Sequence, residues 1–341
     1  MSTIVTTLPK IDLCCSLVGS MTHTLAAELM QERGMTANVA DLLIGGSCAA
    51  WDASLDAFAA LLVRPGNVEA IAYSLAQRLI SEAVVHAEVH VDPRRPALPI
   101  DAVFDAIERG FERAIEDSED ALLSWVVIAE VRRGDDAQRF ADDLEAMREA
   151  MGSRLAAVAL TGDEGTPLGD LGPVLDRARD SGLRLVVTAG YGGNRKTADE
   201  ALALEPARVV HGHRLPRDDD ALTLLRARRV PIICLPTLEM HCGLVRPGAP
   251  PSLVRLLESG LFATIASGAP GLLKTTMTRE LEGLSQAMGW RLEQMRTGTA
   301  RAVEAAFIDP KLRFVVARAV ENWRHRPRLT AGPTDDGYSL G

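Results

Sequence analysis

The chain has 341 residues, of which 47% are hydrophobic and 24% are charged, a balance that excludes a disordered or fibrous protein. Its net charge of -9 excludes nucleic acid as an expected partner, because binding to a phosphate backbone requires clustered basic residues. The sequence contains no apolar run of membrane-span or signal-peptide length, and its five cysteines show no C-x-x-C spacing, so we expect a cytoplasmic, non-membrane protein with reduced thiols.

Apolar runs of strand length alternate with amphipathic helical stretches, a pattern typical of βα units and of a parallel sheet that is buried on both faces. In chain order the runs are residues 11–17, 83–92, 122–131, 155–161, 183–189, 208–211, 231–235 and 262–267. Helical patterns cover residues 101–117, 136–151, 168–181, 197–204, 218–227 and 251–259. Together they predict an α/β protein with a (β/α)8 TIM barrel. The alternative is an open doubly wound sheet, but no Gly-rich dinucleotide loop supports it.

Two further stretches suggest additions to the barrel. Residues 22–67 are long and helical, which predicts an extra helical cap over the barrel mouth after the first strand, and residues 277–309 predict closing helices. We therefore expect one barrel domain over residues 1–326 and a mobile tail over residues 327–341.

Short motifs follow the predicted strands in a fixed order. Lys10, Leu13, Leu17, Gly19 and Ser20 surround the first strand, Gly162-Asp163-Glu164 follows the fourth, and His211-Gly212 ends the sixth. By these motifs, residues 8–325 resemble the adenosine deaminase family. The resemblance implies a (β/α)8 barrel of the metal-dependent hydrolase type, in which zinc activates a water molecule.

The resemblance also shows where this chain departs from the family. The two zinc histidines of the first strand fall on Cys14 and Ser16. The His-Ala-Gly-Glu of the fifth strand is Thr188-Ala189-Gly190-Tyr191, and the Ser-Asp-Asp-Pro of the eighth is Ser267-Gly268-Ala269-Pro270. Without a metal, water keeps a pKa of about 15.7 rather than about 7, and without the glutamate the proton shuttle is missing. We therefore expect no metal, no cofactor and no zinc-dependent deamination.

Three residues are candidates for catalysis, and each also has a structural interpretation. Alternation along a strand directs Cys14 and Ser16 to the position of the family's ligands and Cys15 away from it. Cys14 is either a small buried hydrophobic residue or a nucleophilic thiolate. His211 is placed to act as a general acid or base. Tyr191 either donates to a developing oxyanion or fills a vacated cavity.

The candidate substrate-binding residues are polar groups near the strand ends. In the family, the segment after the fourth strand lies near the base of the substrate, although its carboxylates also have an interpretation as loop caps. We expect the hydroxyl groups to line a largely neutral pocket. The full set is Ser16, Gly162, Asp163, Glu164, Thr188, His213 and Ser267.

Two other groups of residues contain ionisable side chains or possible metal ligands. His86, Glu88 and His90 share one face of the second strand, and we interpret them as an internal polar layer. A replacement metal site would combine Cys14 and His211 with Cys234 or His90, but their spacing matches no recognised ligand motif.

These features predict a metal-independent enzyme for a small substrate, either nucleoside-like or a specialised metabolite. Elimination, cyclisation or isomerisation would fit, because none of these reactions requires an activated water molecule. The alternative is a catalytically inactive pseudoenzyme that binds a ligand or a partner protein. The sequence leaves the oligomeric state open.

Overall fold

Eight parallel strands form one sheet whose order follows the chain from β1 to β8. The computed structural model describes residues 2–119, 121–192, 195–213, 215, 219–246 and 248–323. The strands are β1 (Lys10–Ser16), β2 (Val84–Val91), β3 (Ser124–Arg132), β4 (Leu155–Thr161), β5 (Arg184–Ala189), β6 (Arg208–His211), β7 (Ile232–Cys234) and β8 (Ala263–Ile265). The Ser16 N–H donates to the Gly268 carbonyl, and the Gly268 N–H donates to that of Cys14, so the sheet is a nearly closed barrel. The predicted (β/α)8 fold is confirmed.

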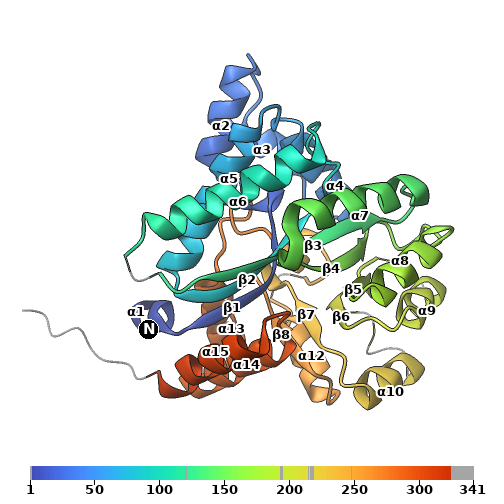
Figure 1. Cartoon of the computed structure of the whole chain (residues 1–341). Helices are drawn as coiled ribbons and strands as arrows, with labels where there is room; N and C mark the ends of the chain where they lie inside the picture. Colours follow the sequence, from blue (N-terminus) through green and yellow to red (C-terminus); the bar gives the residue numbers. More distant parts are fainter. Residues whose placement is uncertain are drawn as a thin grey trace, which may run out of the picture.

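Helices surround the barrel (Figure 1). Those that follow β2 to β7 are α6 (Ile100–Glu116), α7 (Ala137–Met151), α8 (Leu171–Asp180), α9 (Arg195–Ala203), α10 (Asp219–Ala227), α11 (Pro236–His241) and α12 (Ser252–Glu258). After β8 come α13 (Met277–Met288), α14 (Leu292–Ala305) and α15 (Pro310–Asn322), and α1 (Ser2–Thr7) precedes β1. No helix within the described ranges is both long and apolar enough to span a membrane. The tail predicted at residues 327–341 lies outside the described residues.

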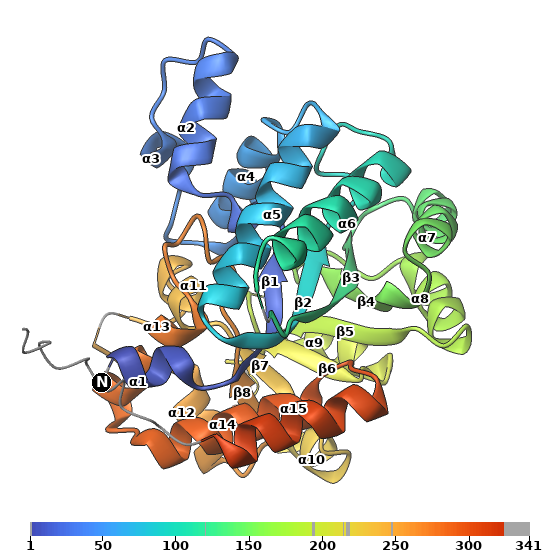
Figure 2. The same ribbon diagram turned by 60° about the vertical axis from the view of Figure 1, so that its left-hand side comes forward.

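The connection from β1 to β2 carries the predicted helical extension. It comprises α2 (His23–Glu32), α3 (Val39–Leu42), α4 (Cys48–Ala59) and α5 (Pro65–Ser81). Figure 2 shows α2 and α3 projecting away from the barrel, whereas α5 packs beside α6. The Ser47 hydroxyl accepts a hydrogen bond from the Ala50 N–H and caps the start of α4. The hydrogen bond satisfies one of the free N–H groups of the first turn of α4.

A buried ion pair crosses the barrel interior at the start of β6. Arg208 Nη1 lies 2.5 Å from Glu88 Oε2, and both side chains are fully buried. Arg208 also donates to the carbonyls of Leu13 and Ala305, while Glu88 accepts from the Phe307 N–H. Burial acts to raise the pKa of Glu88, but Arg208 and the other neighbours lower it to about 2. Glu88 thus belongs to an internal polar layer, in agreement with its sequence interpretation.

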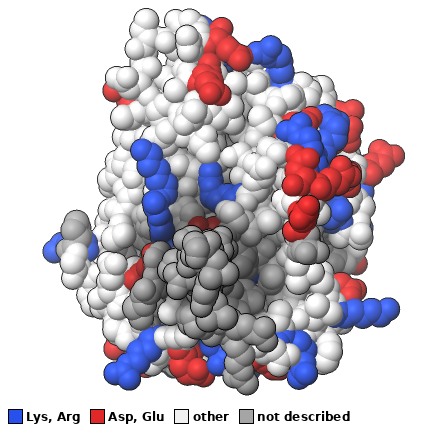
Figure 3. Space-filling model, turned by 90° about the vertical axis from the view of Figure 1, so that its left-hand side faces the viewer, with Lys and Arg blue, Asp and Glu red and all other residues white. Residues whose placement is uncertain are grey.

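Charged side chains on the surface are mixed in sign. Figure 3 shows acidic and basic groups interspersed with large uncharged areas on one face. Some of these charges form pairs between helices: Arg109 and Arg113 of α6 contact Glu69 of α5 at 3.2 and 2.8 Å. Exposed pairs of this kind contribute little to stability.

Candidate active site

A cavity of about 90 Å³ lies at the carboxyl ends of the barrel strands. This is the end at which barrel enzymes carry their active sites. Six of the predicted site residues line the cavity, namely Cys14, Ser16, Gly162, Thr188, Tyr191 and His211. The strand alternation at β1 is as predicted, because the Cys15 thiol points elsewhere and donates to the Glu88 carbonyl at 3.4 Å.

Ser267, predicted to be one of the hydroxyl groups of the pocket, is not among the residues that line the cavity. Its hydroxyl donates to Asp12 Oδ2 at 2.5 Å, and its backbone N–H donates to Asp12 Oδ1 at 3.1 Å. Burial raises the pKa of Asp12 to about 6, against the lowering effect of the hydrogen bonds from Ser267. Ser267 therefore satisfies a buried carboxyl group.

Asp163, Glu164 and His213 also lie outside the cavity lining. Glu164 is buried and accepts hydrogen bonds from the backbone N–H groups of Tyr191 and Gly192 at 3.1 and 2.8 Å. Asp163 is exposed and accepts from a backbone N–H two residues later, and His213 is buried. The predicted role of Asp163, Glu164 and His213 in substrate binding stays a prediction. Glu164 positions the loop that carries Tyr191.

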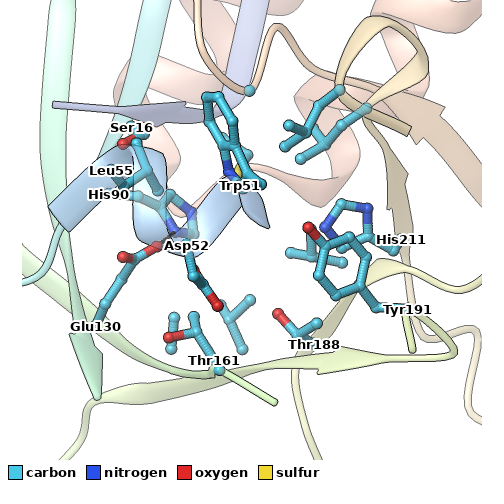
Figure 4. Close-up of a pocket in the computed structure, with 18 of the residues that line it drawn as sticks. Ser16, Trp51, Asp52, Leu55, His90, Glu130, Thr161, Thr188, Tyr191 and His211 are labelled. Carbon is cyan, nitrogen blue, oxygen red and sulfur yellow. Dashed lines mark hydrogen bonds and ion pairs between the residues drawn. The ribbon is translucent and has the colours of Figure 1, made fainter. Parts of the chain in front are cut away.

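One wall of the cavity is aromatic. The rings of Tyr191 and His211 stack with their centroids 4.1 Å apart and their planes at 22° (Figure 4). The Tyr191 hydroxyl lies 3.2 Å from the Cys242 sulfur, and burial raises the pKa of Tyr191 well above its usual range, so the phenol stays protonated. His211 Nδ1 lies 3.6 Å from the fully buried Glu239 carboxylate. Its backbone has a φ of 74°, in the left-handed region.

The opposite wall carries a histidine between a thiol and a carboxylate. His90 Nδ1 lies 3.2 Å from Glu130 Oε1, and the His90 side chain is only 3% exposed. Burial acts to lower the pKa of His90, but Cys14 and Glu130 raise it to about 10. The pKa of Glu130 is lowered, because His90 outweighs the effect of its burial. Figure 4 shows His90 and Glu130 across the cavity from His211 and Tyr191.

Helix α4 closes the cavity with Trp51, Asp52 and Leu55. Arg95, which follows β2, holds this helix through Asp52 at 3.1 Å and Asp56 at 2.6 Å. Burial raises the pKa of Asp52, although Arg95 acts against that shift. The mouth is thus charged, and the pocket is less neutral than expected.

Sequence reasoning missed several cavity residues, which lie on α4, on β2 to β4 and in the loop after β2. For His90 and Glu130 a signal existed: both are ionisable residues at the carboxyl end of a predicted strand, where barrel chemistry takes place. For α4 the sequence predicted a cap but not which helix face points inward. His90 was interpreted as part of an internal polar layer, but it lines the cavity. The missed residues include Trp51, Asp52, Leu55, Arg95, Glu130 and Thr161.

The residues present do not fit the zinc site that the family resemblance implies. Cys14, Ser16, Thr188 and Gly268 stand at the family's ligand positions. Within the described part of the chain, no three His, Cys, Asp or Glu side chains are grouped so that they could hold one metal ion. A zinc site requires three or four such donors around one point.

Comparisons with known proteins agree with the architecture. The family model described as "Adenosine deaminase" matches residues 36–323. An adenine deaminase of Rhodospirillum rubrum is 28% identical over 316 residues, covering 89% of this chain and 93% of the relative. An adenosine deaminase of Clostridium botulinum is 24% identical over 324 residues, covering 91% and 96%.

Solved structures show the same fold. The adenine deaminase of Arthrobacter aurescens superposes with a TM-score of 0.82 at 22% identity, over 93% of this chain and 99% of that one. The Arabidopsis N6-mAMP deaminase superposes with a TM-score of 0.82 at 17% identity, over 93% and 98%. The match to the family model covers most of the sequence, and the chain therefore belongs to the adenosine deaminase family.

Proposed function

We propose that this chain is an enzyme that acts on a small planar nitrogen heterocycle without a catalytic zinc ion. The observation that carries the proposal is the exchange of donors at the strand ends: Cys14, Ser16, Thr188 and Gly268 replace the family's ligands, yet ionisable side chains still face the cavity. A site that had only lost its function would not need buried ionisable groups, which are costly to retain.

The shape of the cavity supports a planar substrate. The stacked rings of Tyr191 and His211 form a flat wall, and aromatic rings pack well against such a surface. At about 90 Å³ the cavity is smaller than the roughly 300 Å³ at which pockets for drug-sized ligands begin. Relatives named adenine deaminase make a purine base the first class to test.

His211 and Tyr191 supply acid and base groups for such a substrate. The His211 imidazole lies 3.6 Å from the Glu239 carboxylate and is the ring that would act as general acid or base in such a reaction. The protonated Tyr191 phenol is a hydrogen-bond donor for a developing negative charge. Elimination, cyclisation or isomerisation can proceed with these groups alone.

A ligand-binding barrel without catalysis is the second candidate. The observation that favours it is the buried Tyr191 ring, which occupies part of the space at the end of β5. Such a protein would bind a heterocycle and release it unchanged.

The test combines metal analysis with a substrate panel. Protein purified without a metal-affinity column is analysed by mass spectrometry for metals, then incubated with adenine, adenosine, AMP and their 6-oxo counterparts. We expect substoichiometric zinc and turnover that survives a chelator. Stoichiometric zinc whose removal abolishes turnover would overturn the proposal, and calorimetric binding without turnover would favour the second candidate.

The matched variant for this test is His211→Ala. It should lose turnover while the melting temperature stays close to that of the wild type. Unchanged turnover would remove His211 from the mechanism.

A further inference from the structure

Three adjacent strands each place one reactive side chain on the same wall of the cavity. Cys14 comes from β1, His90 from β2 and Glu130 from β3, and all three line the cavity. In the parallel pairing of β1 with β2, Ser16 lies opposite His90, which brings the end of β1 beside the histidine. The acid–base pair proposed above, on the opposite wall, uses none of these three residues.

The hydrogen bond between His90 and Glu130 fixes the orientation of the imidazole. His90 Nδ1 is hydrogen-bonded to Glu130 Oε1 at 3.2 Å. The other ring nitrogen, Nε2, is therefore the one available to the Cys14 thiol. Among the described residues Nε2 has no nitrogen or oxygen partner, although it is buried. A nucleophile beside a base that a third group orients is the arrangement that activates catalytic cysteines.

We infer that Cys14 is a catalytic nucleophile, with His90 as its acid–base partner and Glu130 as a positioning residue. The substrate class is a small planar molecule with an amidine or amide carbon, such as the amino-bearing carbon of a purine. The inference rests on the proposed function in two respects: a heterocycle binds in this cavity, and no zinc ion takes part. It widens the accessible reactions, because the Cys14 thiolate makes the first attack, and the water that follows is activated by His90 instead of by zinc.

The first half-reaction forms a covalent intermediate. The Cys14 thiolate adds to the electrophilic carbon, and the C=N π pair moves to the ring nitrogen, which takes a proton from solvent. The His90 imidazolium gives its proton to the amino group, and the C–N bond breaks with its electron pair leaving on ammonia. The ring nitrogen returns its proton to solvent, and a thioimidate remains on Cys14.

The second half-reaction restores the enzyme. Water adds to the same carbon while neutral His90 takes one of its protons and the ring nitrogen takes another from solvent. The C–S bond breaks with its electron pair returning to sulfur, and the new hydroxyl loses its proton to solvent. The sum is one amino group replaced by oxygen, with one water consumed, one ammonia released and no oxidant or reductant.

The test uses 6-chloropurine, because displacement of its chloride by a thiolate forms the same thioimidate as the proposed intermediate. The reaction is quenched with denaturing acid at a series of short times, before water can release the purine from Cys14. Peptide mass spectrometry locates the purine adduct, and its rate of formation is measured over a range of probe concentrations. We expect the adduct on Cys14 in the wild type and on no other cysteine at the same rate. His90→Gln should slow it by roughly 100-fold, as expected from loss of an acid–base group.

Two variants separate catalysis from structure. Glu130→Gln should lower the maximal labelling rate while the half-saturating probe concentration stays within about twofold of the wild type. Cys15→Ala removes the neighbouring thiol on the outer face of β1 and should leave labelling of Cys14 unchanged. Thermal unfolding of each variant confirms that it is folded.

The inference is overturned if Cys14 of the folded protein is unlabelled at every quenched time point, or if the labelling rate of Cys14 is the same in His90→Gln. Its failure is distinct from that of the proposed function. If the metal-free protein turns over a purine and the Cys14→Ser variant is equally active, the proposed function stands. The role of Cys14 as nucleophile is then refuted.

Discussion

The charge on His90 offers the sharpest test of the reasoning about the site. Its pKa lies at about 10, against an ordinary value of 6.5, because Cys14 and Glu130 outweigh the effect of burial. A charge pair 3.2 Å apart at an effective dielectric constant of about 20 has a Coulomb energy of roughly 5 kcal/mol. Because Cys14 also raises the pKa of His90, removal of the Glu130 charge should reverse only part of the increase. Glu130→Gln should lower the pKa of His90 by roughly 2 units, equivalent to about 3 kcal/mol.

The same shift predicts a dependence of stability on pH. The raised pKa of His90 contributes stability that is fully present below pH 6.5 and is lost as pH rises toward 10. In Glu130→Gln the unfolding free energy should fall by a smaller amount as pH rises, and the fall should end at a lower pH.

Nuclear magnetic resonance titration of the histidine ring protons measures the pKa directly, with His90→Gln used to assign the signal. A thermal or urea unfolding series over the same pH range measures the stability. A wild-type His90 that titrates at or below 6.5 would refute the argument, as would a Glu130→Gln variant with an unchanged titration.

Three further predictions concern the supporting structure. Burial raises the pKa of Glu280 from 4.5 to about 7, so its contribution to stability is present at low pH and lost as pH rises through 7; Glu280→Gln should therefore stabilise the protein at about pH 8 by up to roughly 3 kcal/mol in urea unfolding. Arg208→Ala should lower the unfolding free energy by roughly 3–5 kcal/mol, because Glu88 stays buried without its partner, and adding Glu88→Gln should recover part of the loss in a double-mutant cycle. Glu164→Gln should reduce stability by about 1–2 kcal/mol, measured by thermal unfolding, because two backbone N–H groups lose a charged acceptor next to Tyr191.

The sequence was sufficient for the barrel, because strands buried on both faces appear as apolar runs regardless of how they pair. Strand alternation likewise placed Cys14 and Ser16 at the cavity and Cys15 away from it. The alternation of side chains along a strand does not predict where a side chain points once the strand has ended. Ser267 follows β8, where the backbone bonds that join Gly268 to β1 determine where its hydroxyl points.

The meeting of His90 with Glu130 was equally beyond the sequence. Both lie in separate apolar runs, and whether they touch depends on the register between β2 and β3. The inward face of α4 depends on the ion pairs that Arg95 makes with it, which link segments about 40 residues apart in the chain.

His211 bears on how this protein would respond to selection. A non-glycine residue in the left-handed region costs about 1–3 kcal/mol, and here Gly212, the next residue, is also left-handed with a φ of 65°. A glycine at position 211 would relieve that strain and lose the imidazole. Directed evolution for thermostability alone would thus tend to discard this residue, so an engineering programme should hold it fixed or screen for function in every round.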